Sequence, residues 1–137
     1  MTSDLASQIR NSEKLTSIFG RWPSFHDGYL RQVTFEPSQD CVMKFKVFET
    51  TTAIDSRGFF IQTKHTVASI RFAECEALRV EAGFAGCIVF DLKIEPIRLE
   101  IRPGNGWAVE LSASTDFHLT LRCTSIEVLE VAAESNS

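Results

Sequence analysis

The stretch "CVMKFKVFE", residues 41–49, decides the fold, because its apolar side chains recur at every second position. Two lysines and one phenylalanine alternate with them. A period of two is typical of a β-strand with one face on a core and the other in water. The stretch therefore predicts a half-buried strand, and its core face consists of Cys41, Met43, Phe45 and Val47.

Similar segments lie on both sides of this strand. Before it comes "YLRQVTFEP" (29–37); after it come a loop, "TTAIDSRG" (51–58), the short "FFIQ" and "HTVASIRFAEC" (65–75). The later segments are "EALRVEA", "CIVFDLKIE", "IRLEIRP", "WAVELSA", "FHLTLRC" and "SIEVLEV", with turn signals such as "PGNG" (103–106) between most of them. Pro96 has no N–H to donate to a ladder, so we expect a bend or a break between two strands there.

One short helix precedes the strands. Leu15, Ile18 and Phe19 recur at helical spacing, Ser12 is a candidate N-cap, and Gly20 can end the helix in a left-handed conformation. The 137 residues fit a single domain (1–137), in which we expect residues 1–11 and 133–137 to be flexible. The predicted fold is all-β and mainly antiparallel: a sandwich or partly open barrel of about nine short strands with one short N-terminal helix.

The composition excludes several classes of function. Hydrophobic residues make up 44% and charged residues 23%, as in ordinary globular proteins. A net charge of −4 gives no general attraction for nucleic acid. The opening residues lack the apolar core of a secretion signal, and no run is long enough to span a bilayer, so we expect a cytoplasmic protein without membrane contact. The four cysteines form no CxxC pair, and we expect them to be buried, with no metal and no cofactor.

The densest stretch is "RWPSFHDGYL", residues 21–30. We interpret it as a structural turn in which Trp22 and Phe25 anchor the loop and Pro23 fixes the backbone. Asp27 would accept a hydrogen bond from the backbone two residues on, and Gly28 would supply a positive φ. The residues of interest are Trp22, Pro23, Ser24, Phe25, His26 and Asp27.

Chemical alternatives remain open for this stretch. A small enzyme could use His26 with Asp27, although adjacent side chains on a strand point to opposite faces. A metal site could combine these two with His65 and His118, which lie on separate predicted elements, or recruit a cysteine. There is no nucleophile elbow and no phosphate loop; "GFAG" (83–86) is too short for one. We interpret Glu74 and Glu76 as solvated charges at strand ends.

Two surface features are weaker candidates. "PGNGW" places Trp107 beside an exposed turn, where it could serve recognition or close the core. The last strand could present acidic side chains to a basic partner, although an ordinary solvent face explains them equally well: Glu127, Glu130 and Glu134.

Four segments together resemble a known family. "FGRWPSFHDGYL" is similar to the "WPSFHDAE" signature of the immunity protein 50 family of bacterial polymorphic-toxin systems. "HTVASIRFAECEALRVEAGF", "IVFDLKIE" and "LTLRCTSIEVLEV" resemble the later blocks of that family, in order, so that the similarity runs from about residue 18 to about residue 131. This chain has Gly28–Tyr29 where the family signature has a small residue and an acid. It also has "GFAGC" where the family favours polar Asn and Gln.

The resemblance implies a cytoplasmic immunity protein that binds and neutralises a cognate toxin protein without catalysis. It does not locate the toxin-binding residues. A signature shared by members with different toxins is expected to be a folding element rather than a contact surface. An oligomeric adaptor, for example a homodimer that pairs through a strand edge, is the other alternative.

Overall fold

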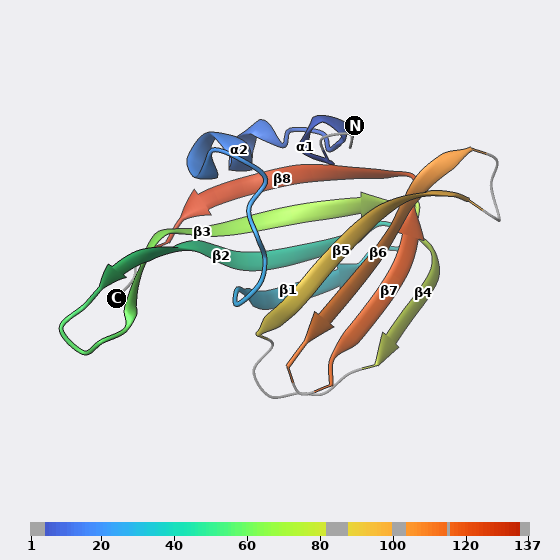
Figure 1. The fold of residues 1–137 in the computed structure, drawn as a ribbon. Helices are drawn as coiled ribbons and strands as arrows, with labels where there is room; N and C mark the ends of the chain where they lie inside the picture. Colours follow the sequence, from blue (N-terminus) through green and yellow to red (C-terminus); the bar gives the residue numbers. More distant parts are fainter. Residues whose placement is uncertain (1–4, 82–87, 100–103, 115, 135–137) are drawn as a thin grey trace.

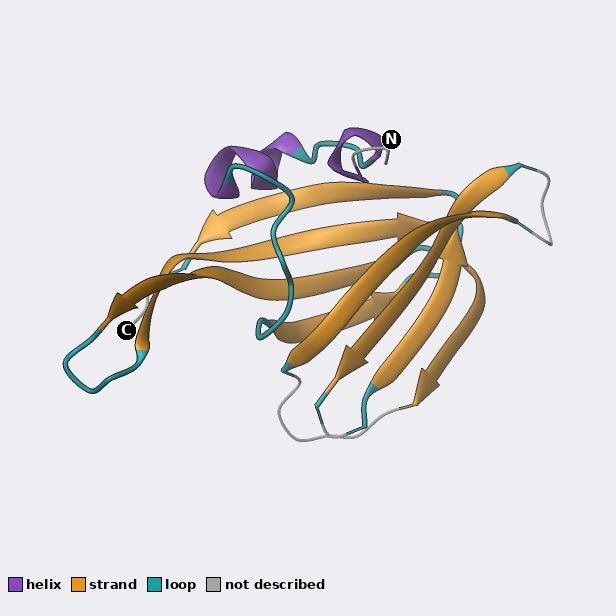
Figure 2. Ribbon diagram, in the orientation of Figure 1, coloured by secondary structure: helices purple, strands orange, loops and turns teal. Residues whose placement is uncertain are grey.

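A computed structural model of the chain describes residues 5–81, 88–99, 104–114 and 116–134. Within these residues, eight strands form two four-stranded sheets, and two short helices precede them (Figure 1). Every strand pair in the two sheets is antiparallel. The predicted fold class, a mainly antiparallel sandwich, is confirmed (Figure 2).

The first sheet has the order β1-β2-β3-β8 and the second has the order β4-β7-β6-β5. The strands of the first sheet are β1 (Tyr29–Phe35), β2 (Cys41–Ile54), β3 (Phe60–Ala73) and β8 (Ser125–Ala133). Those of the second are β4 (Glu76–Glu81), β5 (Val89–Arg98), β6 (Asn105–Ala113) and β7 (His118–Cys123).

The two sheets share a corner. Strand β3 continues into β4 after two residues, and β7 continues into β8 after Thr124 alone. The backbone N–H of Thr124 donates to Ala73 at 2.9 Å, so the ladder carries on across the bend. Glu74 takes a positive φ of 54° at this turn. One pair of neighbouring strands therefore runs through both layers.

The core lies between the sheets and under the helical segment. On β2 the four predicted core positions are each at most 1% exposed, and the inward side chains of β3, β6, β7 and β8 are similarly buried. Trp107 is only 9% exposed, so it belongs to the core and not to an exposed recognition turn. The alternation in the sequence is thus the alternation between core and surface.

The predicted helix is α2 (Glu13–Phe19), which buries Leu15 and Phe19 and ends at Gly20 with φ 78°. Ser12 precedes it but does not cap it, because its hydroxyl donates to the carbonyl oxygen of Ala6 at 2.5 Å. A four-residue helix, α1 (Leu5–Gln8), lies within the segment that was expected to be flexible. Neither of these described helices has the length and apolar character needed to cross a membrane.

Several predicted boundaries were wrong. Pro96 does not break a strand: β5 runs through it, and Pro96 pairs with Trp107. An edge strand tolerates proline because one side of its backbone needs no partner. "FFIQ" and "HTVASIRFAEC" belong to the single strand β3, and β2 extends into the expected loop as far as Ile54. These mergers give eight described strands where about nine were expected.

Candidate functional site

Residues 21–28, called the strap below, cross from α2 to β1 of the first sheet and are hydrogen-bonded to β5 of the second (Figure 1). The backbone N–H of Asp27 donates to Val89 of β5, and Val89 donates back to Gly28, both at 2.8 Å. The next residue, Tyr29, pairs with Lys46 of β2. The strap therefore links the first sheet to the edge of the second.

Aromatic packing anchors the strap. Phe25 is 5% exposed, and its ring lies edge-on to that of Phe45, with 5.0 Å between the centroids. Trp22 is half-buried and lies against Phe25 at 5.7 Å. The structural interpretation of these residues agrees with this geometry, because the strap packs on the β2 core face that the sequence identified.

The chemistry of the turn differs from the expectation. The positive φ belongs to Asp27, at 69°, and not to Gly28. Gly28 is needed for a different reason: a Cβ there would lie 2.5 Å from the backbone oxygen of Lys46. The side chain that accepts a backbone hydrogen bond is Ser24, whose Oγ receives the N–H of His26 at 3.2 Å.

His26 is held by the scaffold and faces water. Its Nδ1 lies 2.7 Å from the backbone oxygen of Phe90, and its Nε2 lies 3.5 Å from a carboxylate oxygen of Asp27. The two side chains are 61% and 64% exposed. In a working dyad one ring nitrogen is oriented and the other faces the substrate. Here Nδ1 is bonded to a carbonyl and Nε2 faces the neighbouring carboxylate, which is an arrangement suited to anchoring.

The other two histidines occupy separate places. His118 on β7 lies 2.9 Å from Glu110 of β6. The ring of His65 lies against Phe48, with 5.6 Å between centroids. Within the described residues no group of three His, Cys, Asp or Glu side chains could hold a metal ion. The structure therefore does not bring together the ligands of the metal alternative.

Two of the three described cysteines are buried, as the sequence predicted. Cys41 and Cys123 are buried, and Cys75 is half-buried. Burial, with a smaller contribution from neighbouring Cys75, raises the pKa of the Cys41 thiol to about 12 and raises the pKa of Cys123 as well. Both thiols are therefore protonated and weakly nucleophilic. Cys87 and the "GFAG" segment lie outside the described residues.

Of the two carboxylates beside Cys75, Glu74 is exposed, as interpreted, whereas the interpretation of Glu76 as a solvated charge was wrong. Glu76 is only 8% exposed, and neither of its carboxylate oxygens has a hydrogen-bond partner among the described residues. Glu74 accepts a hydrogen bond from the Thr124 hydroxyl at 2.9 Å. Two of the three acidic residues expected on the last strand form ion pairs, Glu127 with Arg71 and Glu134 with Arg31, whereas Glu130 is exposed. These ion pairs reduce the acidic surface that this part of the chain could offer to a basic partner.

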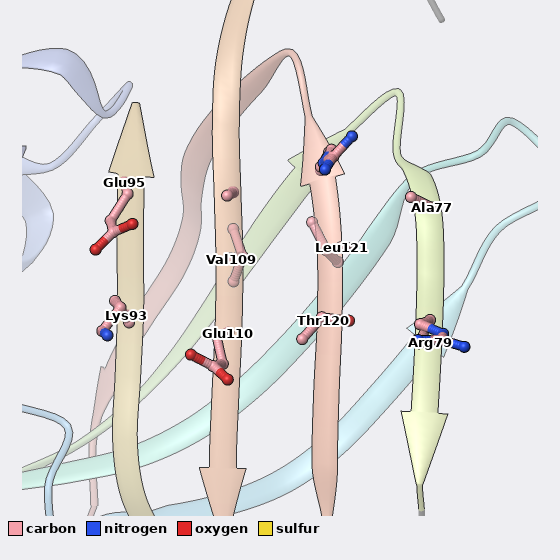
Figure 3. A pocket seen from close by; sticks show the side chains of 10 residues that line it. Ala77, Arg79, Lys93, Glu95, Val109, Glu110, Thr120 and Leu121 are labelled. Atoms are coloured by element: carbon pink, nitrogen blue, oxygen red, sulfur yellow. The ribbon is translucent and has the colours of Figure 1, made fainter. Parts of the chain in front are cut away.

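A shallow hollow of about 380 Å³ crosses the outer face of the second sheet (Figure 3). One row across its four strands consists of Lys93, Glu110, Thr120 and Arg79, in register. The row holds two basic side chains, one acidic side chain and one neutral hydroxyl, so the hollow favours neither cations nor anions strongly. It is a surface for contact rather than an enclosed reaction site.

The β2–β3 hairpin exposes large apolar side chains that the sequence analysis did not predict to be exposed. Strand β1 pairs with β2 only as far as Lys46, and β8 pairs with β3 only from Thr66. The hairpin tip, residues 54–61, therefore projects beyond both neighbours (Figure 1). Its large apolar side chains are 40–67% exposed: Ile54, Phe59, Phe60 and Ile61.

A defined turn holds this tip. One carboxylate oxygen of Asp55 accepts the N–H groups of Arg57 and Phe59 at 2.8 and 3.0 Å, and Gly58 supplies a φ of 87°. At its base, Lys64 pairs with Glu49 at 3.3 Å. The sequence signal was the "FF" directly after "DSRG", but a pattern alone does not reveal that neighbouring strands stop short of it.

No family model matches the chain, and no curated protein matches it significantly. The similarity to immunity protein 50 accordingly stays a resemblance of motifs.

Proposed function

We propose that this chain is an immunity protein that binds a cognate bacterial toxin and neutralises it without catalysis. The motif resemblance suggests this role. The observation that carries the proposal is the hairpin tip, where a fixed turn displays large apolar side chains that no described residue covers. Apolar patches of a few hundred Å² on a protein surface are often interaction sites.

The rest of the molecule suits an inhibitor. Such a protein needs a scaffold that keeps its shape and an exposed surface that fits its target. The corner and the strap connect the two sheets on different sides, and the hairpin extends from the first sheet.

The test starts from the gene that lies directly upstream. If that gene encodes a large multidomain toxin, its C-terminal domain is produced in bacteria with and without this chain. We expect the chain to restore growth and to form a complex with the purified domain. A toxin domain that kills equally well in its presence, and that does not bind it, contradicts the proposal.

A further inference from the structure

We infer that the hairpin tip enters a concave, apolar-walled cleft of the toxin, with Arg57 directed at an acidic group inside it. The inference rests on the proposed function and adds the contact surface and the chemistry of its partner. Three properties of the tip support it: its area, its shape and its charge.

The area of the tip suits the centre of an interface. Phe59 and Phe60 are 67% and 59% exposed. With about 200 Å² for each phenylalanine and similar areas for the two isoleucines, the tip leaves on the order of 400 Å² of apolar surface uncovered. A partner in a stable complex buries roughly 800 Å². The tip therefore supplies about half of one side of a standard interface, which matches an apolar centre surrounded by a polar rim.

The shape of the tip favours a cleft over a second copy of this chain. Two tips in contact would bury roughly 800 Å² in total, below the 1,200–2,000 Å² of specific stable interfaces. Each tip is also convex, since it projects beyond β1 and β8 (Figure 1). A convex protrusion is complementary to a concave surface and not to another protrusion.

The charge of the tip points to an acidic group in the cleft. Arg57 is exposed at the turn, and its guanidinium has no ion-pair or hydrogen-bond partner within the described residues. Asp55, the nearest carboxylate in sequence, uses one oxygen for backbone N–H groups of the turn. A guanidinium that becomes desolvated on binding needs a carboxylate or phosphate partner.

The rim of the interface is also present. The exposed side of the strap, including His26 and Asp27, borders a depression whose opposite wall is formed by Phe48, Glu49 and Thr50 at the base of the hairpin. Polar groups in this position can surround the apolar centre and fix its orientation.

The experiment measures the affinity of the full chain for the toxin domain encoded upstream. We expect Phe59→Ser with Phe60→Ser to raise Kd by about 100-fold or more, because buried aromatic anchors dominate interface energies. Arg57→Glu should raise Kd by about 10-fold or more. The matched control is Phe35→Ser on β1, whose side chain is 51% exposed and which pairs with Cys41 at the end of β2 opposite the tip, and we expect a change below about 3-fold.

Thermal melts establish that the variants are folded, which we expect because every substituted side chain is exposed. If wild type binds the toxin and the tip variants bind equally well, the inference is wrong while the proposed function stands. If wild type does not bind, both are overturned. If the wild-type chain is a dimer and the Phe59 and Phe60 substitutions dissociate it, the tip instead contacts a second copy of this chain. Flotation with phosphatidylethanolamine–phosphatidylglycerol vesicles that depends on these two residues would show that the tip binds a membrane and not the toxin.

Discussion

The ring of Phe25 meets the ring of Phe45 edge to face, with 5.0 Å between the centroids and 73° between the planes. Phe25 belongs to the strap and Phe45 to the centre of β2, where it is fully buried. This contact seats the strap on the core. It also explains how a segment rich in aromatic residues, with a histidine and an aspartate, can have a structural role.

Phe25→Ala should therefore lower the free energy of unfolding by about 3–5 kcal/mol, the usual loss for a buried phenylalanine. Urea denaturation measures it. The control is Phe35→Ala, which removes a half-exposed ring from β1 and should change stability much less. Equal losses from the two substitutions would show that Phe25 is not an anchor.

Gly28→Ala should lower the free energy of unfolding by on the order of several kcal/mol. The new Cβ would lie 2.5 Å from the Lys46 carbonyl oxygen, which is a steric clash with the backbone. Gly20→Ala is the comparison: Gly20 has a left-handed φ but nothing within 4 Å of its Cβ position. It should lose only about 1 kcal/mol, from backbone strain. A Gly28→Ala protein as stable as wild type would mean that the strap does not approach β2 so closely.

His26→Ala should lower the free energy of unfolding by about 0.5–1.5 kcal/mol, since it removes one hydrogen bond at an exposed site. It should affect stability more than toxin affinity. Because the Phe90 carbonyl can only accept, the proton must reside on Nδ1, and nitrogen NMR of the His26 ring can observe it. Unchanged melting together with lost neutralisation would make His26 a main contributor to toxin binding and not the minor rim contact expected here.

Glu76→Met should stabilise the protein, by roughly 1–3 kcal/mol, because a carboxylate that is buried without a partner loses its hydration and gains nothing in return. Thermal and urea unfolding measure the change. Glu74→Met is the control, and it should be neutral or destabilising, because that carboxylate accepts the Thr124 hydroxyl. Destabilisation by Glu76→Met would indicate a bound partner for this carboxylate.

Hydrogen bonds from Arg31 and Lys46 hold the pKa of Glu134 below its ordinary value of 4.5. A depressed pKa in the folded state means that the ion pairs stabilise the protein fully above about pH 4.5. That contribution is lost as the pH falls from there through the folded-state pKa. The difference in melting temperature between wild type and Glu134→Gln should therefore shrink under acid. It should also shrink in high salt, whereas Glu130→Gln should show neither trend.

The sequence predicts the layers better than their edges. Alternation identified the buried face of β2, because the core imposes that period on every central strand. It could not reveal that Pro96 lies in an edge strand, nor that Glu76 is buried, because both depend on which strands become neighbours. For the strap, sequence reasoning anticipated that Trp22 and Phe25 anchor the loop. It placed the positive φ at Gly28 instead of Asp27, since the close approach of Lys46 is a tertiary contact.

The hairpin tip illustrates the same limit. A run such as "IDSRGFF" indicates a turn flanked by apolar residues, and a turn of this kind is compatible with burial or exposure. Only the lengths of β1 and β8 relative to β2 and β3 leave Phe59 and Phe60 uncovered. The exposure of these two side chains therefore depends on the lengths of the neighbouring strands and not on the sequence of the hairpin itself.

The bend at Thr124 and the strap at Gly28 restrain the sandwich on separate sides. Two sheets that are connected at two separate places cannot easily move apart. We therefore expect the chain to bind its partner as a rigid body, without a change in the arrangement of the sheets. Backbone amides at the bend and around Val89 should then exchange with deuterium at nearly the same slow rate, free or bound. The protection gained on complex formation should concentrate around residues 54–61.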